Sequence, residues 1–371
     1  MERSRLRKPQ PVGELRYPFD EPPRPGECLT VAPGVQWLRM PLPGALDHIN
    51  VWLIDEHDGL AIVDTGVRSF ESAALWEHML DPPALRKPRR VLLTHRHADH
   101  AGMAGWLASR YGCELWMTND EYLAARMALW ECQAPPSPAV SMFYRRAGWE
   151  ADALAHYRER HGYYADYMFN LPSQYYRLQD GQVLRIGDHD WTVITGGGHS
   201  VEHACLYCPS LRLLIAGDQV LPRISSNVSV MPQEPDANPL AQRIDALQHL
   251  RRSVPADVLV LPSHNDCFHG LHVRIDQLLR GQERALQRLR EALAKPRRVI
   301  DVFRALFARH IASRSSEYTL ATGEALACLN YLIARGEVCR ERRCGGTHWY
   351  RLTHEAATGA PGHPSHERKP A

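Results

Sequence analysis

The sequence predicts a mixed α/β protein in which two packed β-sheets are flanked by helices and followed by a smaller C-terminal domain. Apolar or alternating runs at 35–40, 49–54 and 60–63 indicate consecutive strands before the first helical pattern, at 69–80. Such grouping favours two packed sheets over the regular strand–helix alternation of a doubly wound parallel sheet. After Gly270 the pattern becomes mainly helical. A chain of 371 residues is long enough for a large core and two domains.

The composition divides the chain into four parts. Residues 1–27 are rich in proline and charge, and we expect a flexible segment there. Residues 28–270 form the main α/β domain, with a helical insert at about 119–170 that we expect to cover a site and shape its choice of ligand. Residues 271–352 begin with a linker helix. Because two further helical patterns then precede a hairpin pattern, they predict a winged-helix domain. Residues 353–371 are expected to be a disordered tail.

Composition and charge narrow the setting in which the protein acts. No stretch approaches the roughly 20 apolar residues of a membrane span, and the basic N-terminus lacks the apolar core of a secretory signal, so we expect a cytoplasmic protein without membrane contact. The net charge is +2, but residues 271–352 carry 16 basic and 8 acidic side chains, a local +8. This region either meets a polyanion or simply has arginines on solvated helix faces.

The segment Thr94–His100 carries three imidazoles and one carboxylate within six residues. It follows an apolar run at 90–93, predicted as a buried strand, and precedes a helical pattern at 101–111. Folds with α/β architecture place their chemistry at such strand ends. His95 and His97 are two apart on an extended segment, so both point to the same side. Asp99 and His100, at the following turn, then face a second ion.

Three more ligand-type residues follow later strands. His199 comes after three glycines, which allow the backbone to approach a metal or substrate closely. Asp218 and His264 each follow an apolar run as well. Together, five histidines and two aspartates suffice for two divalent ions with one bridging carboxylate. Imidazole and carboxylate donors favour zinc, with iron or manganese as alternatives.

This ordered set closely resembles the metallo-β-lactamase superfamily, from about Val35 to His264. The resemblance rests on the H-x-H-x-D-H motif, the three later ligands and the strand-end sequence Val63-Asp64-Thr65-Gly66, which is similar to the family's D-T-G. It implies a four-layer αβ/βα sandwich. It also implies that a first ion is held by His95, His97 and His199, a second by Asp99, His100 and His264, and that Asp218 bridges both.

Further features refine this resemblance. The presence of both Asp99 and Asp218 looks more like the glyoxalase-II-type branch than the true β-lactamases. Four short stretches, together with the C-terminal helices and hairpin, resemble members that carry a β-lactamase-associated winged-helix domain: 47–50, 198–203, 217–222 and 270–272. Asn265 stands where glycine is common in those relatives, which puts the turn after His264 in question.

The resemblance implies a dinuclear metal-dependent hydrolase in which a metal-bound hydroxide attacks an activated carbonyl. We expect a small-molecule thioester or ester substrate of the acyl-CoA or glutathione type, with the basic region at 271–352 meeting the phosphates of a CoA carrier. Asp99 or Asp218 would orient the nucleophile or move a proton. His203 would bind substrate or stabilise the oxyanion. Alternatively, it is a core histidine or contacts only the metal-ligating residues. Three more histidines are candidates for contact with the pocket: His48, His269 and His272.

Two other functions compete with this one. The first is a single-strand endoribonuclease, whose RNA would follow the +8 region and whose binding would weaken steeply with salt. The second is a winged-helix regulator that binds DNA without catalysis. The segment 322–335 is too apolar to read base edges, so we expect no specific DNA binding. We expect the C-terminal module to pack on the main domain or on a second subunit of a homodimer.

Overall fold

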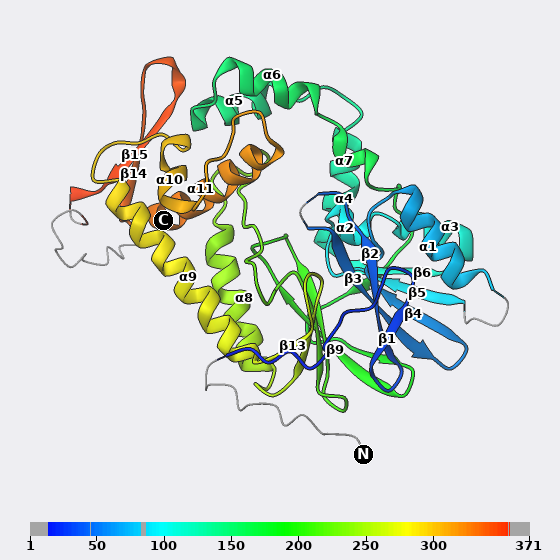
Figure 1. The fold of residues 1–371 in the computed structure, drawn as a ribbon. Helices are drawn as coiled ribbons and strands as arrows, with labels where there is room; N and C mark the ends of the chain where they lie inside the picture. The colour runs from blue at the N-terminus through cyan, green and yellow to red at the C-terminus, as the bar shows by residue number, and fades with distance from the viewer. Residues whose placement is uncertain (1–13, 45, 83–86, 355, 357–371) are drawn as a thin grey trace, which may run out of the picture. The chain divides into compact units, whose positions relative to one another are not determined.

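The structure, a computed structural model, describes residues 14–44, 46–82, 87–354 and 356 (Figure 1). Residues 1–13 of the expected N-terminal segment and nearly all of the expected tail therefore lie outside the described residues. The chain divides into two compact units. The sheet unit comprises residues 1–135, 161–226 and 242–279, and the C-terminal unit comprises residues 136–160, 227–241 and 280–371.

The sheet unit contains a seven-stranded sheet whose strands follow the order of the sequence. Its strands are β1 (Cys28–Ala32), β2 (Val35–Pro41), β3 (His48–Glu56), β4 (Gly59–Val63), β5 (Pro88–Leu92), β6 (Glu114–Thr118) and β7 (Tyr176–Leu178). β1 to β4 pair antiparallel, whereas β4 to β7 pair parallel. The parallel half therefore directs the ends of β4 and β5 to the same edge of the sheet.

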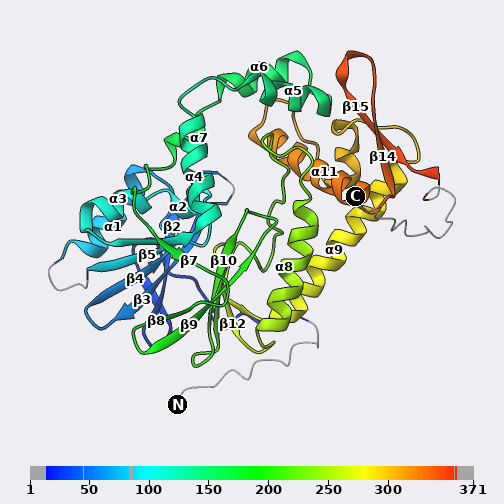
Figure 2. The same ribbon diagram turned by 180° about the vertical axis from the view of Figure 1, so that it is seen from behind.

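The second, six-stranded sheet has the order β13-β12-β11-β10-β9-β8 (Figure 2). Its strands are β8 (Val183–Ile186), β9 (His189–Gly196), β10 (His203–Cys208), β11 (Leu213–Gly217), β12 (Leu259–Pro262) and β13 (Phe268–His269). β11 and β12 pair parallel, so Asp218 and His264 follow strand ends at one edge.

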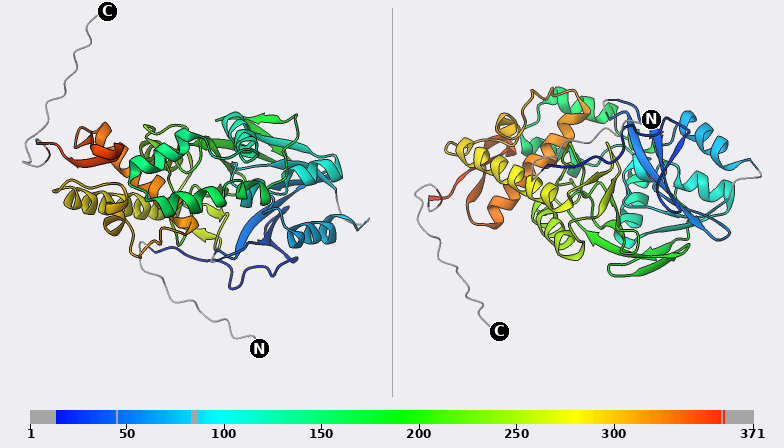
Figure 3. Two further views of the ribbon diagram at one scale, coloured as in Figure 1. Left: turned by 90° about the horizontal axis from the view of Figure 1, so that it is seen from above. Right: turned by 60° about the horizontal axis from the view of Figure 1, so that its bottom comes forward.

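Helices flank both sheets within this unit. They are α1 (Phe70–Leu80), α2 (Ala98–Ala101), α3 (Ala104–Tyr111), α4 (Asn119–Glu131) and α7 (Tyr163–Asp166), together with most of α8 (Pro239–Ser253) and the first turns of α9 (Leu271–Ala292). From right to left, Figure 1 shows α1 and α3, the blue strands, the green strands, and then α8 and α9. Figure 3 shows the chain from two further directions.

Three apolar clusters fill the spaces between these layers. Trp76 and Leu107 belong to the cluster between the helices α1 to α4 and the seven-stranded sheet. Trp52 and Trp191 belong to the cluster between the two sheets. Leu250 belongs to the cluster that joins the six-stranded sheet to α8 and α9. Because side chains alternate along a strand, each sheet contributes to the clusters on both of its faces. The result is the αβ/βα layering expected from the sequence.

The C-terminal unit contains α5 (Pro138–Ala147), α6 (Ala151–Glu159), the 3-10 helix η1 (Ile300–Val302), α10 (Phe303–Leu306), α11 (Ser316–Ala334) and the antiparallel hairpin of β14 (Val338–Arg342) and β15 (His348–Leu352). Trp149, which follows α5, packs its ring 4.8 Å from that of Tyr318 and donates a hydrogen bond from Nε1 to Thr322 Oγ1 (2.9 Å). The helical insert of the sequence analysis is thus divided: α4 and α7 belong to the sheet unit, α5 and α6 to the C-terminal unit.

The structure also shows where the patterns were incomplete. The helix expected at 101–111 is interrupted between α2 and α3. Arg16 pairs with His269 as an isolated antiparallel bridge, although residues 1–27 were expected to be flexible. Strands β1, β7 and β13 were not expected. Among the described residues, no helix is both long enough and apolar enough to cross a lipid bilayer.

From the partly buried carboxyl of Glu324 on α11 we predict a pH-dependent stability of the C-terminal unit. Burial raises the pKa of Glu324 from 4.5 to about 7, while Asn227 Nδ2 donates to it (2.8 Å) and opposes this shift. Between these two pH values the unfolded chain ionises and the folded chain does not, so stability falls as the pH rises. Relative to Glu324→Gln, we expect the parent to lose about 3 kcal/mol over this window.

Calorimetry of the parent and Glu324→Gln at pH 5 and pH 7.5 measures this difference. The melting temperature of the parent should fall by several degrees more than that of the variant. Equal changes in both proteins would show that the carboxyl is not protonated in the folded state.

Candidate metal centre

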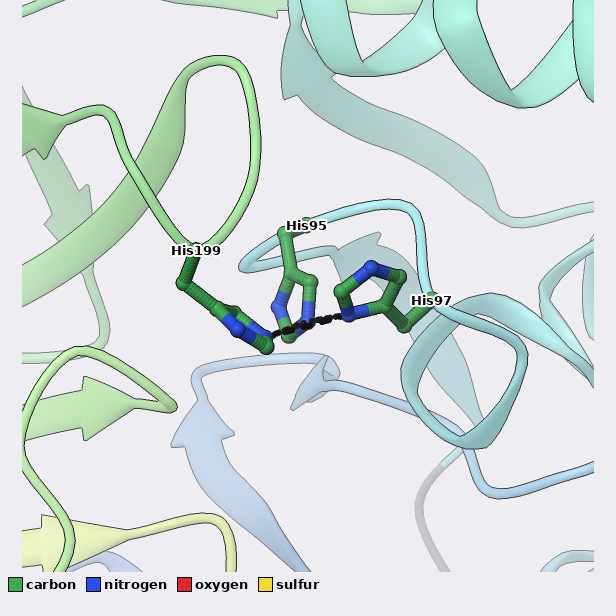
Figure 4. A group of neighbouring side chains, drawn as sticks. All are labelled: His95, His97 and His199. Atoms are coloured by element: carbon green, nitrogen blue, oxygen red, sulfur yellow. Dashed lines mark hydrogen bonds between the residues drawn. The ribbon is translucent and has the colours of Figure 1, made fainter. Parts of the chain in front are cut away.

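Three imidazoles converge at the ends of β5 and β9. His95 and His97 lie in the loop after β5, and His199 in the loop after β9 (Figure 4). His95 Nε2 lies 2.9 Å from His97 Nδ1, His97 Nδ1 3.1 Å from His199 Nε2, and His199 Nε2 3.2 Å from His95 Nε2. Three nitrogens bound to one tetrahedral zinc ion at 2.0–2.1 Å would be about 3.3 Å apart. The three-histidine group therefore has nearly the spacing of a metal tripod.

A second group forms beside the first. Asp99 and His100 lie at the start of α2, and His264 follows β12. Asp99 Oδ2 lies 3.4 Å from His100 Nε2 and 3.3 Å from His264 Nε2. His100 and His264 are almost completely buried, whereas 26% of the Asp99 side chain is exposed. Solvent therefore reaches the second group at Asp99.

Asp218 lies between the two groups and faces both. Its Oδ1 is 3.6 Å from His100 Nε2 and 3.4 Å from His264 Nε2, and its Oδ2 is 3.3 Å from His199 Nε2. All seven ligand candidates of the sequence analysis are thus brought together. Three sets of donor atoms able to hold a metal ion result: His95–His97–His199, His95–His100–Asp218 and Asp99–His100–His264.

Two buried atoms in this cluster are suited to binding a cation. His100 Nε2 and Asp218 Oδ1 are inaccessible to solvent, and neither has a hydrogen-bond partner among the described residues. Buried polar atoms without partners are rare in folded proteins and call for an explanation such as an ion. A divalent metal ion meets the need of both atoms, since imidazole nitrogen and carboxylate oxygen are ordinary ligands of zinc, iron and manganese.

Hydrogen bonds on the outer side of the rings fix which nitrogen faces the cluster. His264 Nδ1 donates to the carbonyl oxygen of His48 (3.0 Å), and His100 Nδ1 donates to Asp64 Oδ2 (2.8 Å). The Nε2 atoms of both rings then face the carboxylates of the cluster. Asp64 itself accepts from the backbone N–H of Thr94 (2.9 Å). The sequence analysis noted Asp64 only within a family motif and did not foresee this contact.

The electrostatic environment holds His95, His97 and Asp218 in forms that bind metals. Burial, with the neighbouring imidazoles, lowers the pKa of His95 and His97 well below the ordinary value, so both keep a lone pair. Burial alone would raise the pKa of Asp218, but the nearby His264 and His100 lower it well below its usual range. Burial alone would lower the pKa of His100 and His264, but the carboxylates of Asp99 and Asp218 raise it. A divalent cation bound by these two imidazoles would therefore displace protons from them.

His203 lies behind the cluster and outside its three donor sets. Its side chain is fully buried, and its Nε2 accepts a hydrogen bond from the backbone N–H of Asp218 (3.0 Å). A Cβ on Gly217 would lie 2.4 Å from the same nitrogen, so glycine is needed for this close approach. The contact positions Asp218. Contact of His203 with substrate stays a prediction.

The other histidine candidates have local partners. His48 Nε2 accepts from the backbone N–H of Asn265 (3.0 Å), and its Nδ1 lies 2.6 Å from Asp47 Oδ1. His269 Nδ1 donates to the carbonyl oxygen of Val258 (3.1 Å). His272 Nε2 donates to that of Val254 (2.8 Å). Only His48 among them touches the turn that carries His264.

Two local conformations explain sequence features beside the ligands. Asn265 has φ +66°, a left-handed conformation that asparagine tolerates better than most residues, so the turn after His264 forms without a glycine at this position. Gly198 has φ +110°, and a Cβ there would lie 2.5 Å from Arg243 Cβ on α8. The glycine before His199 therefore allows close packing against α8, whereas we had expected it to allow approach to a metal or substrate.

Comparisons with known proteins agree with this geometry. The profile of the Metallo-beta-lactamase superfamily matches residues 44–264, and that of the Metallo-beta-lactamase-like, C-terminal domain matches residues 286–353. A crystal structure of a beta-lactamase domain protein from Burkholderia ambifaria is 40% identical, with a TM-score of 0.81, over 91% of this chain and 97% of that one. The chain therefore belongs to the metallo-β-lactamase superfamily of metallo-hydrolases.

More distant relatives have names that describe activities. The probable metallo-hydrolase YqjP of Bacillus subtilis is 24% identical over 73% of this chain and 84% of its own length. The acyl-coenzyme A thioesterase MBLAC2 of Homo sapiens is 25% identical over 50% of this chain and 63% of its own length. The matched part is thus under two thirds of the human protein.

Asp64 offers a test of the outer hydrogen bonds. In Asp64→Asn, the group facing His100 Nδ1 is an amide and no longer carries a negative charge. Asparagine tolerates the left-handed φ of +62° at this position, so the backbone need not change. Loss of such an outer partner typically costs 10–100-fold in metal affinity, and we expect about that loss here. Competition with a chelating dye measures it. The same change at the exposed Asp190 should leave the affinity unaltered, and unaltered affinity in Asp64→Asn would contradict the role of this contact.

Proposed function

We propose that this chain is a dinuclear metal-dependent hydrolase that cleaves a small-molecule thioester or ester, of the acyl-CoA or glutathione thioester type. The observation that carries the proposal is the placement of Asp218, whose two carboxylate oxygens face different ligand groups. A carboxylate shared in this way is suited to bridging two ions. We propose zinc for both positions, with iron and manganese as the alternatives that metal analysis distinguishes.

Two divalent ions, when bound, would supply a nucleophilic water at neutral pH and polarise the carbonyl oxygen of the substrate. The chain itself contributes orientation. Asp99, at the solvent side of the cluster, would accept a proton from the attacking water, and Asp218 would orient that water. His203 holds Asp218 in position, because His203 Nε2 accepts a hydrogen bond from the backbone N–H of Asp218.

The substrate class is supported by three observations of different kinds. The curated relatives include acyl-coenzyme A thioesterases of vertebrates, and the pair Asp99 and Asp218 resembles the ligand set of the glyoxalase-II-type branch. The local +8 charge of residues 271–352 suits the phosphates of a CoA carrier. We propose further that residues 271–352 form a linker helix and a winged-helix domain, which packs on the main domain or on a second subunit of a homodimer. We also propose that the protein works in the cytoplasm.

The same positive charge keeps single-strand RNA as a competing substrate. Three of the 16 basic side chains of this region pair with acidic side chains that the net charge already includes: Arg290 with Glu337, Arg298 with Asp301, and Arg351 with Glu341. These pairs weaken the case for a continuous track along a phosphate backbone, so thioester hydrolysis is preferred.

Metal content and a substrate panel test the proposal together. We expect about two transition ions per chain and hydrolysis of acyl-CoA or glutathione thioesters above the rates for lactones and single-strand RNA. Cleavage of a small thioester should change little between 50 and 200 mM salt, whereas RNA binding through many phosphates would weaken by orders of magnitude. Protein without transition ions that gains no activity from added zinc or manganese would contradict the proposal.

Asp218→Asn separates the bridging role from general stability. An amide offers one oxygen in place of two and carries no charge, so we expect the variant to retain about one ion per chain and to lose most hydrolytic activity. Elemental analysis and thioester assays measure both. Asp190→Asn again serves as the control, and retention of two tightly held ions by Asp218→Asn would rule out the bridging role.

A further inference from the structure

We propose that Glu121 is a positioning residue for the three-histidine group, because its carboxylate ties together the two loops that carry His95, His97 and His199. This inference rests on the proposed metal centre. Glu121 lies in the first turn of α4, within the insert at 119–170 that we expected to cover the site, but it was not among the candidate site residues.

Each oxygen of Glu121 accepts a hydrogen bond from a different loop. Oε2 accepts from the backbone N–H of Arg96 (2.9 Å), and Oε1 accepts from the backbone N–H of Glu202 (2.8 Å). Arg96 stands between His95 and His97, and Glu202 follows His199 by three residues. The Glu121 side chain is completely buried. One carboxylate thus sets the separation of the loops that must bring three imidazoles to one point.

The carbonyl groups of the same two loop residues are also held. Thr118 Oγ1 donates to the carbonyl oxygen of Glu202 (2.8 Å), and the Tyr164 hydroxyl donates to that of Arg96 (2.5 Å). The backbone N–H and carbonyl groups of both Arg96 and Glu202 therefore have hydrogen-bond partners. The N–H groups bond to Glu121, and the carbonyl groups bond to Tyr164 and Thr118. The loops have little freedom to shift relative to each other without breaking several of these bonds.

The start of α4 uses its capping residues for these contacts. Thr118-x-x-Glu121 matches the capping-box pattern, in which the two side chains bond to each other's backbone N–H groups. In the structure Thr118 is the N-cap residue but makes no side-chain capping bond. The Glu202 carboxylate accepts from the backbone N–H of Asp120 (3.2 Å), so the ligand loop caps the helix in return. A purely local helix start would need none of these long-range contacts.

A carboxylate is specifically suited to this position. Both of its oxygens accept, and both partners are N–H donors, so an amide would place an NH₂ group against one of them. Glu121→Gln consequently keeps the size of the side chain and breaks the link to one loop. The substitution touches neither the Asp99–His100–His264 group nor any side chain that donates to an ion.

The experiment compares Glu121→Gln with Asp120→Asn, the same acid-to-amide change at the exposed neighbouring residue. Each protein is titrated with zinc against a chelating dye and, after replacement by cobalt(II), its visible spectrum is recorded. We expect Glu121→Gln to bind one of two ions 10–100-fold more weakly and to show an altered cobalt spectrum, with the other ion held as in the parent. Asp120→Asn should bind both ions as the parent does.

Thr118→Val provides a second variant in case Glu121→Gln does not fold. It removes only the hydroxyl contact to Glu202 and should weaken the same ion in the same direction. If the parent binds two ions and both variants bind them with parental affinity and spectrum, the inference is overturned and the proposed function stands. If the parent binds no ion, the proposed function fails and the inference with it.

Discussion

The site depends on a simple requirement: inward-facing nitrogens and oxygens must keep their lone pairs free in a buried place. An imidazole can do so only if its other nitrogen has a partner elsewhere. His100 has Asp64 and His264 has the carbonyl oxygen of His48. Without these outer bonds the rings would be free to turn and to form hydrogen bonds with one another. His100 Nε2 and Asp218 Oδ1 would then not be left without hydrogen-bond partners. The packing around the cluster therefore serves orientation as much as stability.

The strand ends make this orientation possible. β4 and β5 pair parallel in one sheet, and β11 and β12 in the other, so the residues that follow them emerge along one edge of each sheet. The two sheets pack through Trp52 and Trp191, which fixes those edges against each other. Loops that leave such rigid strands hold their side chains with little entropic cost on binding an ion. This explains how ligands more than 150 positions apart in the sequence reach one point.

Much of this was predictable from the sequence because the signals are local. The alternating runs of β2, β3 and β4 and the amphipathic pattern of α9 identified those elements, and the spacing of His95, His97, Asp99 and His100 identified the ligands. β7 and β13 are only three and two residues long, too short for a period-two pattern, and they exist because neighbouring strands pair with them. The contacts of Glu121 and Asp64 were not predictable for a related reason. A carboxylate beside a strand or at a helix start has a local explanation, and only the tertiary structure shows which distant N–H it meets.

The helices of segment 119–170 belong to two units and are held by different contacts. α4 begins at the ligand loops and is bound to them through Glu121, so its position is set by the metal centre. α5 and α6 belong to the C-terminal unit, where Trp149 is fixed to α11 through Thr322. Changes in α5 and α6 can therefore accumulate without altering the geometry of the ligands, whereas changes at the start of α4 cannot. The sequences of α5 and α6 and the metal centre are consequently free to vary independently.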